Sequence, residues 1–234
     1  MALPKLNDKP KYEMKIPSTG DIVRFRPFLV KEEKVLMIAM ESEDNRQMLN
    51  AVVDTLDACV DGGLNKTKLT TFDVEFMFTK LRSKSVGETS TIVIECDHCK
   101  EKNEVNVNLE SLDIETPSGN RVIEISDTIS IEMQYPLYSS ITDISDENMD
   151  STEAAFDLLR SCIAYVITED ERIDMRDENP EEIQEFIESM DRNQFQLIQD
   201  FVDGMPKLSH DIEFECVSCK MKNKKTLEGM ANFF

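Results

Sequence analysis

The sequence predicts an α+β fold, because strand-like and helix-like hydrophobic patterns occupy separate stretches of the chain. Apolar and polar residues alternate near the N-terminus and again between residues 91 and 135, as they do in half-buried strands. In most of the remaining chain the apolar residues recur at the three- and four-residue spacing of amphipathic helices. A cysteine pattern, E-C-x-x-C-K-x-K-N, occurs twice, at residues 95–103 and 215–223. The predicted architecture is an N-terminal hairpin and helices, central antiparallel strands and C-terminal helices, with the two cysteine turns brought together.

The N-terminal part is expected to form a hairpin followed by three helices. Two short alternating runs, residues 12–16 and 22–28, are separated by the turn-forming stretch Pro-Ser-Thr-Gly-Asp. The three predicted helices cover residues 31–41, 44–60 and 71–84. Residues 1–90 are therefore assigned to a hairpin plus helical region, in which residues 1–11 form a loose polar leader.

The rest of the chain is expected to be β-structure first and helical later. Strands are predicted on both sides of the first cysteine turn and in two further alternating runs, namely residues 91–95, 105–109, 121–125 and 128–134. A Ser- and Asp-rich stretch, residues 136–149, predicts a flexible loop. Helices are then expected from Asp150 through Val166, from Pro180 and from Asp191, before a strand over residues 207–215.

This pattern divides the second part of the chain into two regions. Residues 91–135 and 207–234 are assigned to a β region that contains both cysteine turns. Residues 150–204 are assigned to an acidic helical insertion between the turns.

Both cysteine turns have the spacing of zinc knuckles. Cys96 and Cys99 follow one predicted strand, and Cys216 and Cys219 follow another, so two similar loops supply four thiolates. Four cysteines are a common ligand set for a structural zinc ion. The sequence therefore predicts that these residues converge on one structural metal ion, Zn²⁺ or iron, in a zinc-ribbon-like module. Metal closure of so long a loop would tie the end of the chain to its middle.

Other roles for the cysteine turns remain open. A redox C-x-x-C pair usually lies at a helix N-terminus, whereas both pairs here end strands. Catalytic zinc needs an open position; His98 lies inside the first turn, but four thiolates would already fill the coordination sphere. Cys59 and Cys162 lie on apolar helix faces and are expected in the core, whereas His210 precedes a strand and has no predicted partner.

The chain is strongly acidic, with a net charge of −21. Such a charge repels phosphate backbones, so nucleic acid is disfavoured as a partner, and an acidic surface would suit a basic protein partner. A basic group, Lys220, Lys222, Lys224 and Lys225, lies beside the second cysteine pair. It leaves a zinc-ribbon adaptor for nucleic acid or for the transcription machinery as the alternative function.

No motif in the sequence points to catalysis. The chain contains no G-x-S-x-G, phosphate-binding glycine loop or H-E-x-x-H. It also contains no apolar run that could span a bilayer or act as a signal peptide. We therefore expect a non-enzymatic, intracellular protein without a small-molecule substrate or a membrane partner. The acidic helices and the terminal Phe233 and Phe234 are the expected contact surfaces for other proteins.

Several stretches, taken in order, carry a family resemblance. They are Ile16-Pro17-Ser18-Thr19-Gly20, Val23-Arg24-Phe25-Arg26-Pro27-Phe28, Lys31-Glu32-Glu33-Lys34, Asp73 to Arg82 with Ser83 and Gly87, and the strand into Cys96 and Cys99. Together they resemble the baseplate-hub proteins of T-even-type contractile-tailed bacteriophages. The resemblance covers roughly residues 14–110, is weaker across the acidic helices and returns at the second cysteine pair.

The resemblance implies a role in building the baseplate hub, either as a hub subunit or as an assembly factor. It implies other hub or tail proteins as partners, and a location in the host cytoplasm during assembly and in the tail of the virion. It implies no enzymatic activity. It implies that the four cysteines form a metal site, and it implies no further binding residue.

Overall fold

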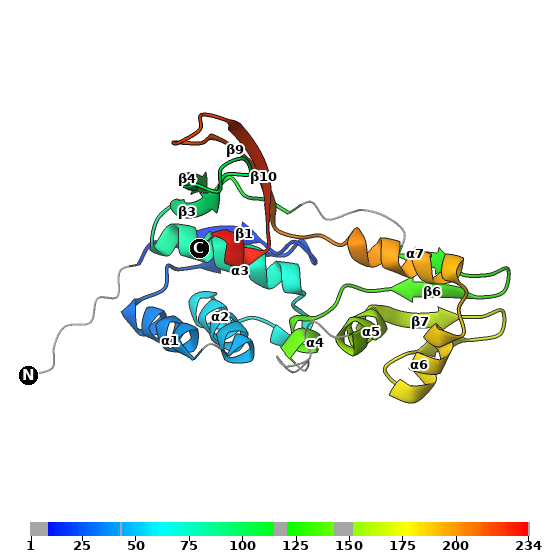
Figure 1. Ribbon diagram of the computed structural model, residues 1–234. Helices are drawn as coiled ribbons and strands as arrows, with labels where there is room; N and C mark the ends of the chain where they lie inside the picture. The colour runs from blue at the N-terminus through cyan, green and yellow to red at the C-terminus, as the bar shows by residue number, and fades with distance from the viewer. Residues whose placement is uncertain (1–8, 43, 115–120, 143–151, 234) are drawn as a thin grey trace, which may run out of the picture. The chain divides into compact units, whose positions relative to one another are not determined.

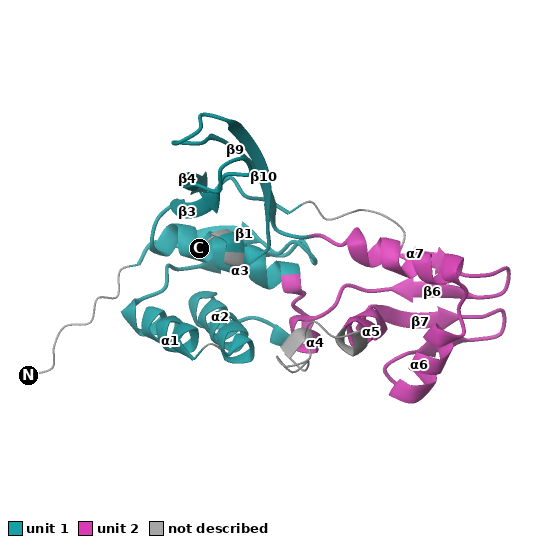
Figure 2. Ribbon diagram, viewed as in Figure 1, with its two compact units in different colours: residues 1–66, 72–116, 207–234 teal, residues 67–71, 117–206 magenta. Residues whose placement is uncertain are grey.

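Residues 9–42, 44–114, 121–142 and 152–233 are described by a computed structural model (Figure 1). They form two compact units, residues 1–66, 72–116 and 207–234 in the first and residues 67–71 and 117–206 in the second (Figure 2). Each unit combines helices with antiparallel strands, which confirms the predicted mixture of helix and sheet. The division differs from the expected one, because the strands within residues 121–135 belong with the helices that follow them.

A β-hairpin opens the first unit. Strand β1 (Tyr12–Lys15) pairs with β2 (Ile22–Phe25), and Gly20 adopts a φ of 78° in the turn. The backbone N–H and hydroxyl of Ser18 donate hydrogen bonds of 2.9 and 2.6 Å to the carboxylate of Asp73. Asp73 is fully buried in the first turn of helix α3 (Thr71–Ser85). The hairpin turn therefore provides hydrogen-bond partners for a buried polar side chain that would be costly to bury without them.

The helices of this unit agree with the sequence-based expectation. They are α1 (Val30–Glu41), α2 (Asn45–Cys59) and α3, and the short 3-10 helix η1 (Lys66–Lys68) follows α2 along the chain. Asp44 caps the start of α2, and its carboxylate accepts a hydrogen bond from the N–H of Gln47. The buried side chains that form the core include Phe25, Val52, Leu56, Phe72, Met77 and Leu81.

Two similar hairpins complete the first unit (Figure 1). The first pairs β3 (Thr89–Glu95) with β4 (Lys102–Asn108), and the second pairs β9 (Ser209–Glu215) with β10 (Lys222–Glu228). Their registers are equivalent at an offset of 120 residues, since Glu95 faces Lys102 and Glu215 faces Lys222. The 3-10 helix η3 (Met230–Phe233) follows β10. The side chain of Phe233 and the whole of Phe234 lie outside the described residues.

The second unit is a four-stranded antiparallel sheet with helices. The strand order is β5 (Val122–Glu124), β6 (Ser130–Met133), β7 (Ile163–Ile167) and β8 (Arg172–Asp174). The helices are α4 (Tyr138–Thr142), α5 (Thr152–Ser161), α6 (Pro180–Glu188) and α7 (Arg192–Asp203). The core of this unit joins the middle strands to three of the helices through Ile131, Met133, Leu159, Ile163, Val166, Ile183, Ile187 and Ile198.

Three predictions in this unit differ from the structure. The helix expected to continue through Val166 ends at Ser161, and the next residues form β7, which pairs with β6. Pairing with a neighbouring strand overrides the helical spacing of the apolar residues, and the sequence Ile-Ala-Tyr-Val-Ile is itself rich in strand-forming types. Strand β8 also lies within the region predicted to be helical. The predicted loop at residues 136–149 contains α4, and residues 143–149 lie outside the described part of the chain.

Candidate metal centre

The four cysteines of the repeated pattern converge at the tips of the two similar hairpins. Their sulfur atoms all lie within 4.8 Å of one another. The Sγ atoms of Cys96 and Cys219 are 3.7 Å apart, and those of Cys99 and Cys216 are 3.6 Å apart. A tetrahedral site with Zn–S bonds of about 2.3 Å requires sulfur–sulfur distances of about 3.8 Å. The spacing therefore fits a tetrahedral metal ion, and the predicted convergence is confirmed.

Each turn directs backbone donors at its first cysteine. The Sγ of Cys96 accepts hydrogen bonds from the backbone N–H groups of His98 and Cys99. The Sγ of Cys216 accepts hydrogen bonds from the two equivalent N–H groups of the second turn. These donors favour a charged sulfur, the form in which cysteine binds metal ions.

A lysine in the left-handed conformation closes each turn. The φ angle is 62° at Lys100 and 60° at Lys220. Their N–H groups donate to the carbonyl groups of Cys96 and Cys216 at 3.0 and 3.1 Å. Both lysine side chains are exposed, so this conformation depends on the backbone geometry of the turn. The repeated pattern shows that the two lysines occupy equivalent positions, but it does not reveal their backbone conformation.

Asn103 and Asn223 connect the two turns directly. The N–H of Val217 donates to the Oδ1 of Asn103 at 2.8 Å, and the N–H of Asp97 donates to the Oδ1 of Asn223 at 2.9 Å. The side-chain amide of each asparagine also donates to a backbone carbonyl of its own turn, at 2.7 and 3.0 Å. Both asparagines are buried. Their identical place in both copies of the repeated pattern was a signal of this shared role.

The thiol groups differ in their electrostatic surroundings. Burial disfavours a charged sulfur at Cys96, but the backbone N–H donors lower the pKa of this thiol to about 6. Backbone donors also lower the pKa of Cys216. At Cys219 the N–H of Met221 favours the thiolate, but desolvation and the neighbouring cysteines raise the pKa to about 12. The turns thus favour a thiolate at the first cysteine of each pair, while the crowding of the sulfur atoms opposes four negative charges without a cation.

The basic group beside the second cysteine pair is partly neutralised within the module. Lys225 forms an ion pair of 2.8 Å with Asp97 of the other turn, and Lys224 forms one of 3.0 Å with Asp211. These carboxylates neutralise two lysine side chains that would otherwise be available to bind a phosphate backbone. The pairs reduce the positive potential on which the nucleic-acid alternative depends.

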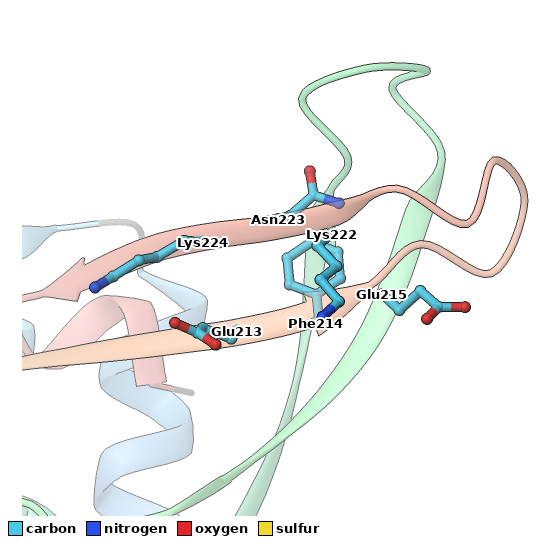
Figure 3. Close-up of a pocket in the computed structure, with 6 residues that line it drawn as sticks. All are labelled: Glu213, Phe214, Glu215, Lys222, Asn223 and Lys224. Atoms are coloured by element: carbon cyan, nitrogen blue, oxygen red, sulfur yellow. The ribbon is translucent and has the colours of Figure 1, made fainter.

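A hollow of about 370 Å³ lies along the second hairpin (Figure 3). It is lined by Glu213, Phe214, Glu215, Lys222, Asn223 and Lys224. Each lysine of the hollow faces a glutamate across the hairpin, Lys222 opposite Glu215 and Lys224 opposite Glu213. The charges of the four side chains balance, so the hollow does not attract an ion of either sign.

The remaining cysteines and histidines do not join the cluster. Cys59 and Cys162 are buried in the cores of the two units, as predicted, and burial raises the pKa of each thiol to about 11. His98 is exposed in the first turn, and His210 is half-buried on β9. Neither imidazole belongs to the group of four candidate ligands that the described residues contain.

The donor set determines what this site can do chemically. Four sulfur ligands in a tetrahedral arrangement suit Zn²⁺ or iron and leave no position for a substrate or a reactive water molecule. The architecture therefore defines a mixed helix and sheet protein with a cluster of four cysteines that is compatible with a metal site. Within the described residues, no helix combines the length and apolar character needed to cross a bilayer.

Comparison with known proteins identifies the family. The sequence model of the family described as "T4 bacteriophage base plate protein" matches residues 9–234, so the chain belongs to this family. No curated protein and no solved structure matches the chain. The match confirms the resemblance to T4-type phage baseplate proteins and extends it across the acidic helices. Family membership indicates a structural role in the phage baseplate, interaction with other tail proteins and a place in the tail of the virion.

Proposed function

We propose that the chain is a non-enzymatic structural or assembly protein of the baseplate hub, which acts through contacts with other hub or tail proteins. The family match over residues 9–234 carries this proposal. The ordered motifs between residues 16 and 34, which resemble those of hub proteins, support the assignment to the hub. The protein would act in the host cytoplasm during assembly and stay in the virion if it is a hub subunit.

We propose that Cys96, Cys99, Cys216 and Cys219 hold a structural Zn²⁺ ion. The sulfur–sulfur distances of 3.6 and 3.7 Å and the two sets of backbone donors support this assignment. The ion would join two hairpins that are 120 residues apart in the sequence and so stabilise the first unit. Its role would be structural, because the four sulfur ligands complete its coordination sphere.

The outer surface of α1 supports a role in protein contacts. Helix α1 packs against α2, and its buried residues are Glu32, Leu36 and Ala39. Five large apolar side chains of the same helix are between 49 and 79% exposed, namely Val30, Val35, Met37, Ile38 and Met40. Apolar side chains concentrated on one helix are typical of a surface that another protein covers.

Co-expression with the hub and tail proteins of the same phage, followed by size-exclusion chromatography, tests the proposed function. We expect a stable complex with at least one of them, and a weaker complex for Ile38→Glu. Val93→Glu is the matched control, because Val93 is 61% exposed and lies on strand β3, which belongs to neither α1 nor α2. The proposal fails if no hub or tail protein binds. Strong DNA or RNA binding that weakens steeply with salt would instead favour the zinc-ribbon adaptor.

A further inference from the structure

A pocket of about 350 Å³ lies in the second unit, beside α6 and strand β8. Its apolar lining comes from Val166, Ile173, Met175, Ile183 and Phe186. Ile173 lies on β8, and Met175 is the first residue of the turn that follows this strand. Ile183 and Phe186 are three residues apart on α6 and share a helix face. Strands β7 and β8, the turn after β8 and helix α6 therefore supply the apolar lining of this pocket.

Three carboxylates complete this pocket, those of Glu171, Glu178 and Glu182. None of its eight lining residues is basic. Among the residues that the structure describes, none of the three carboxylates forms an ion pair. We call this site the acidic-rimmed pocket.

The nearby arginines are engaged with other carboxylates. Arg172 pairs with Glu132 at 2.7 Å, and its guanidinium lies 3.8 Å from the centre of the Tyr165 ring. Arg176 pairs with Asp174 on the same hairpin arm. The protein thus neutralises carboxylates next to the pocket while the three that line it have no cationic partner among the described residues. Their negative potential is directed at whatever enters the pocket.

We propose that the acidic-rimmed pocket docks a segment of another protein in which one large apolar side chain is flanked by Lys or Arg residues. The apolar lining would bury the large side chain, and the flanking cations would pair with Glu171, Glu178 and Glu182. Apolar anchors in pockets supply most of the affinity of such contacts, and charges at the rim supply specificity and association rate.

The chemistry of the lining favours a protein segment over other occupants. A nucleic acid would bring phosphate groups against three carboxylates. A small polar metabolite would need several convergent hydrogen-bond donors, whereas the side chains of this pocket offer carboxylate acceptors and apolar groups. A peptide that carries both basic and apolar side chains matches the carboxylates of the rim and the apolar lining of the pocket.

This inference rests on the proposed function, because it specifies the chemistry of one of the protein contacts. Two experiments separate the inference from that function. Glu171→Lys, Glu178→Lys and Glu182→Lys, combined in one full-length variant, reverse the charge of the rim. The matched control combines Glu181→Lys, Glu185→Lys and Glu188→Lys, three residues of α6 that are exposed and do not line the pocket. Both variants change the net charge by the same amount.

The first experiment selects peptides from a random displayed library on the full-length wild-type chain, with counter-selection on the rim variant. We expect enriched peptides in which Leu, Ile, Met or Phe lies between Lys or Arg residues. Their affinity should fall at least about tenfold for the rim variant and much less for the control variant. Shifts of the Ile173, Met175 and Ile183 methyl signals in NMR spectra should locate the bound peptide.

The inference is overturned if no peptide is enriched, if the enriched peptides lack flanking cations, or if both variants lose affinity equally. The second experiment repeats the co-expression assay with both variants. A complex with hub or tail proteins that the rim variant forms as well as the wild type would refute this pocket as their docking site and leave the proposed function intact. Absence of any complex would refute the proposed function, while the peptide selection would still decide the inference.

Discussion

The guanidinium of Arg26 donates a hydrogen bond of 2.9 Å to the carboxylate of Glu32 at the start of α1. The other carboxylate oxygen accepts a hydrogen bond of 2.8 Å from the N–H of Leu29, which is the residue that caps the helix. The same guanidinium donates to the carbonyl of Ala58 in α2 at 3.0 Å. The guanidinium of Arg26, which follows β2, thus contacts both α1 and α2.

The Arg26–Glu32 pair predicts a specific dependence of stability on pH. Burial disfavours the charged form of Glu32, but hydrogen bonds from Arg26, Leu29 and Lys31 lower its pKa to about 2. Because the folded-state pKa lies below the unfolded value, the stabilisation is present above about pH 4.5 and is lost as the pH falls towards 2. Glu32→Gln should lower the unfolding free energy at pH 7 by on the order of 2 kcal/mol.

Urea unfolding of both proteins across this pH range measures the effect. The difference between the wild type and Glu32→Gln should shrink from pH 4.5 to pH 2. Glu33→Gln, at an exposed position in the same helical turn, should stay within about 0.5 kcal/mol of the wild type. A difference that is constant with pH would contradict the assigned pKa.

Metal analysis of cysteine variants tests the four-sulfur site. Wild-type protein should contain one zinc ion per chain, and Cys96→Ser and Cys216→Ser should each lose it. Chelation or either substitution should lower the melting temperature by roughly 10 °C or more, since a structural zinc ion contributes several kcal/mol. His98→Ala is the control, because this residue lies in the same turn and should leave the zinc content unchanged. Iron at the same stoichiometry would correct the identity of the ion, and unchanged stability of the cysteine variants would refute the proposal that the ion stabilises the first unit.

The asparagine bridges should contribute to the metal site without touching the ion. Asn103→Ala leaves the N–H of Val217 without its acceptor and should cost about 1–3 kcal/mol. Zinc affinity, measured by competition with a chromogenic chelator, should fall about 10-fold or more, as it does for residues that orient ligands. Asn106→Ala removes an exposed asparagine of β4 and should change neither quantity appreciably. Equal effects of the two substitutions would show that Asn103 has no special positioning role.

The left-handed lysines predict a stabilising substitution. Glycine adopts a φ near 60° without the steric cost that Lys100 incurs, so Lys100→Gly should raise the unfolding free energy by about 1 kcal/mol in zinc-saturated protein. Lys102→Gly, two residues further on in β4, should lower it by about 0.5–1 kcal/mol, because glycine weakens a strand. Guanidinium unfolding at fixed zinc concentration measures both. Destabilisation by Lys100→Gly would show that the lysine side chain matters more than its backbone conformation.

The candidate site was predictable because its ligands form a repeated local pattern. Cys96, Cys99, Cys216 and Cys219 carry their spacing in the sequence, and the chemistry of four thiolates requires them to meet. The start of α6 was predictable for a similar reason, since Asn179 and Pro180 act within one helical turn. Local chemistry determines these features.

Features that depend on distant neighbours were not predictable. Val166 lies in a strand because β6 is available to pair with that segment, and nothing within the segment reveals β6. The bridges from Asn103 and Asn223 depend on the mutual orientation of the two turns, which places each amide oxygen next to an N–H group of the opposite turn. The buried carboxylate of Asp73 depends on Ser18, which is 55 residues away in the sequence.

The distance along the chain between the two cysteine turns also has a consequence for synthesis. A ribosome that adds about 5–20 residues per second needs roughly 6–24 s to advance the 120 residues from the first turn to the second. During that interval Cys96 and Cys99 have neither their partner sulfur atoms nor the acceptor on Asn223. The nascent first hairpin therefore exposes reactive thiols until the second hairpin leaves the ribosome, so oxidative damage should fall most heavily on chains whose translation stalls between the two turns.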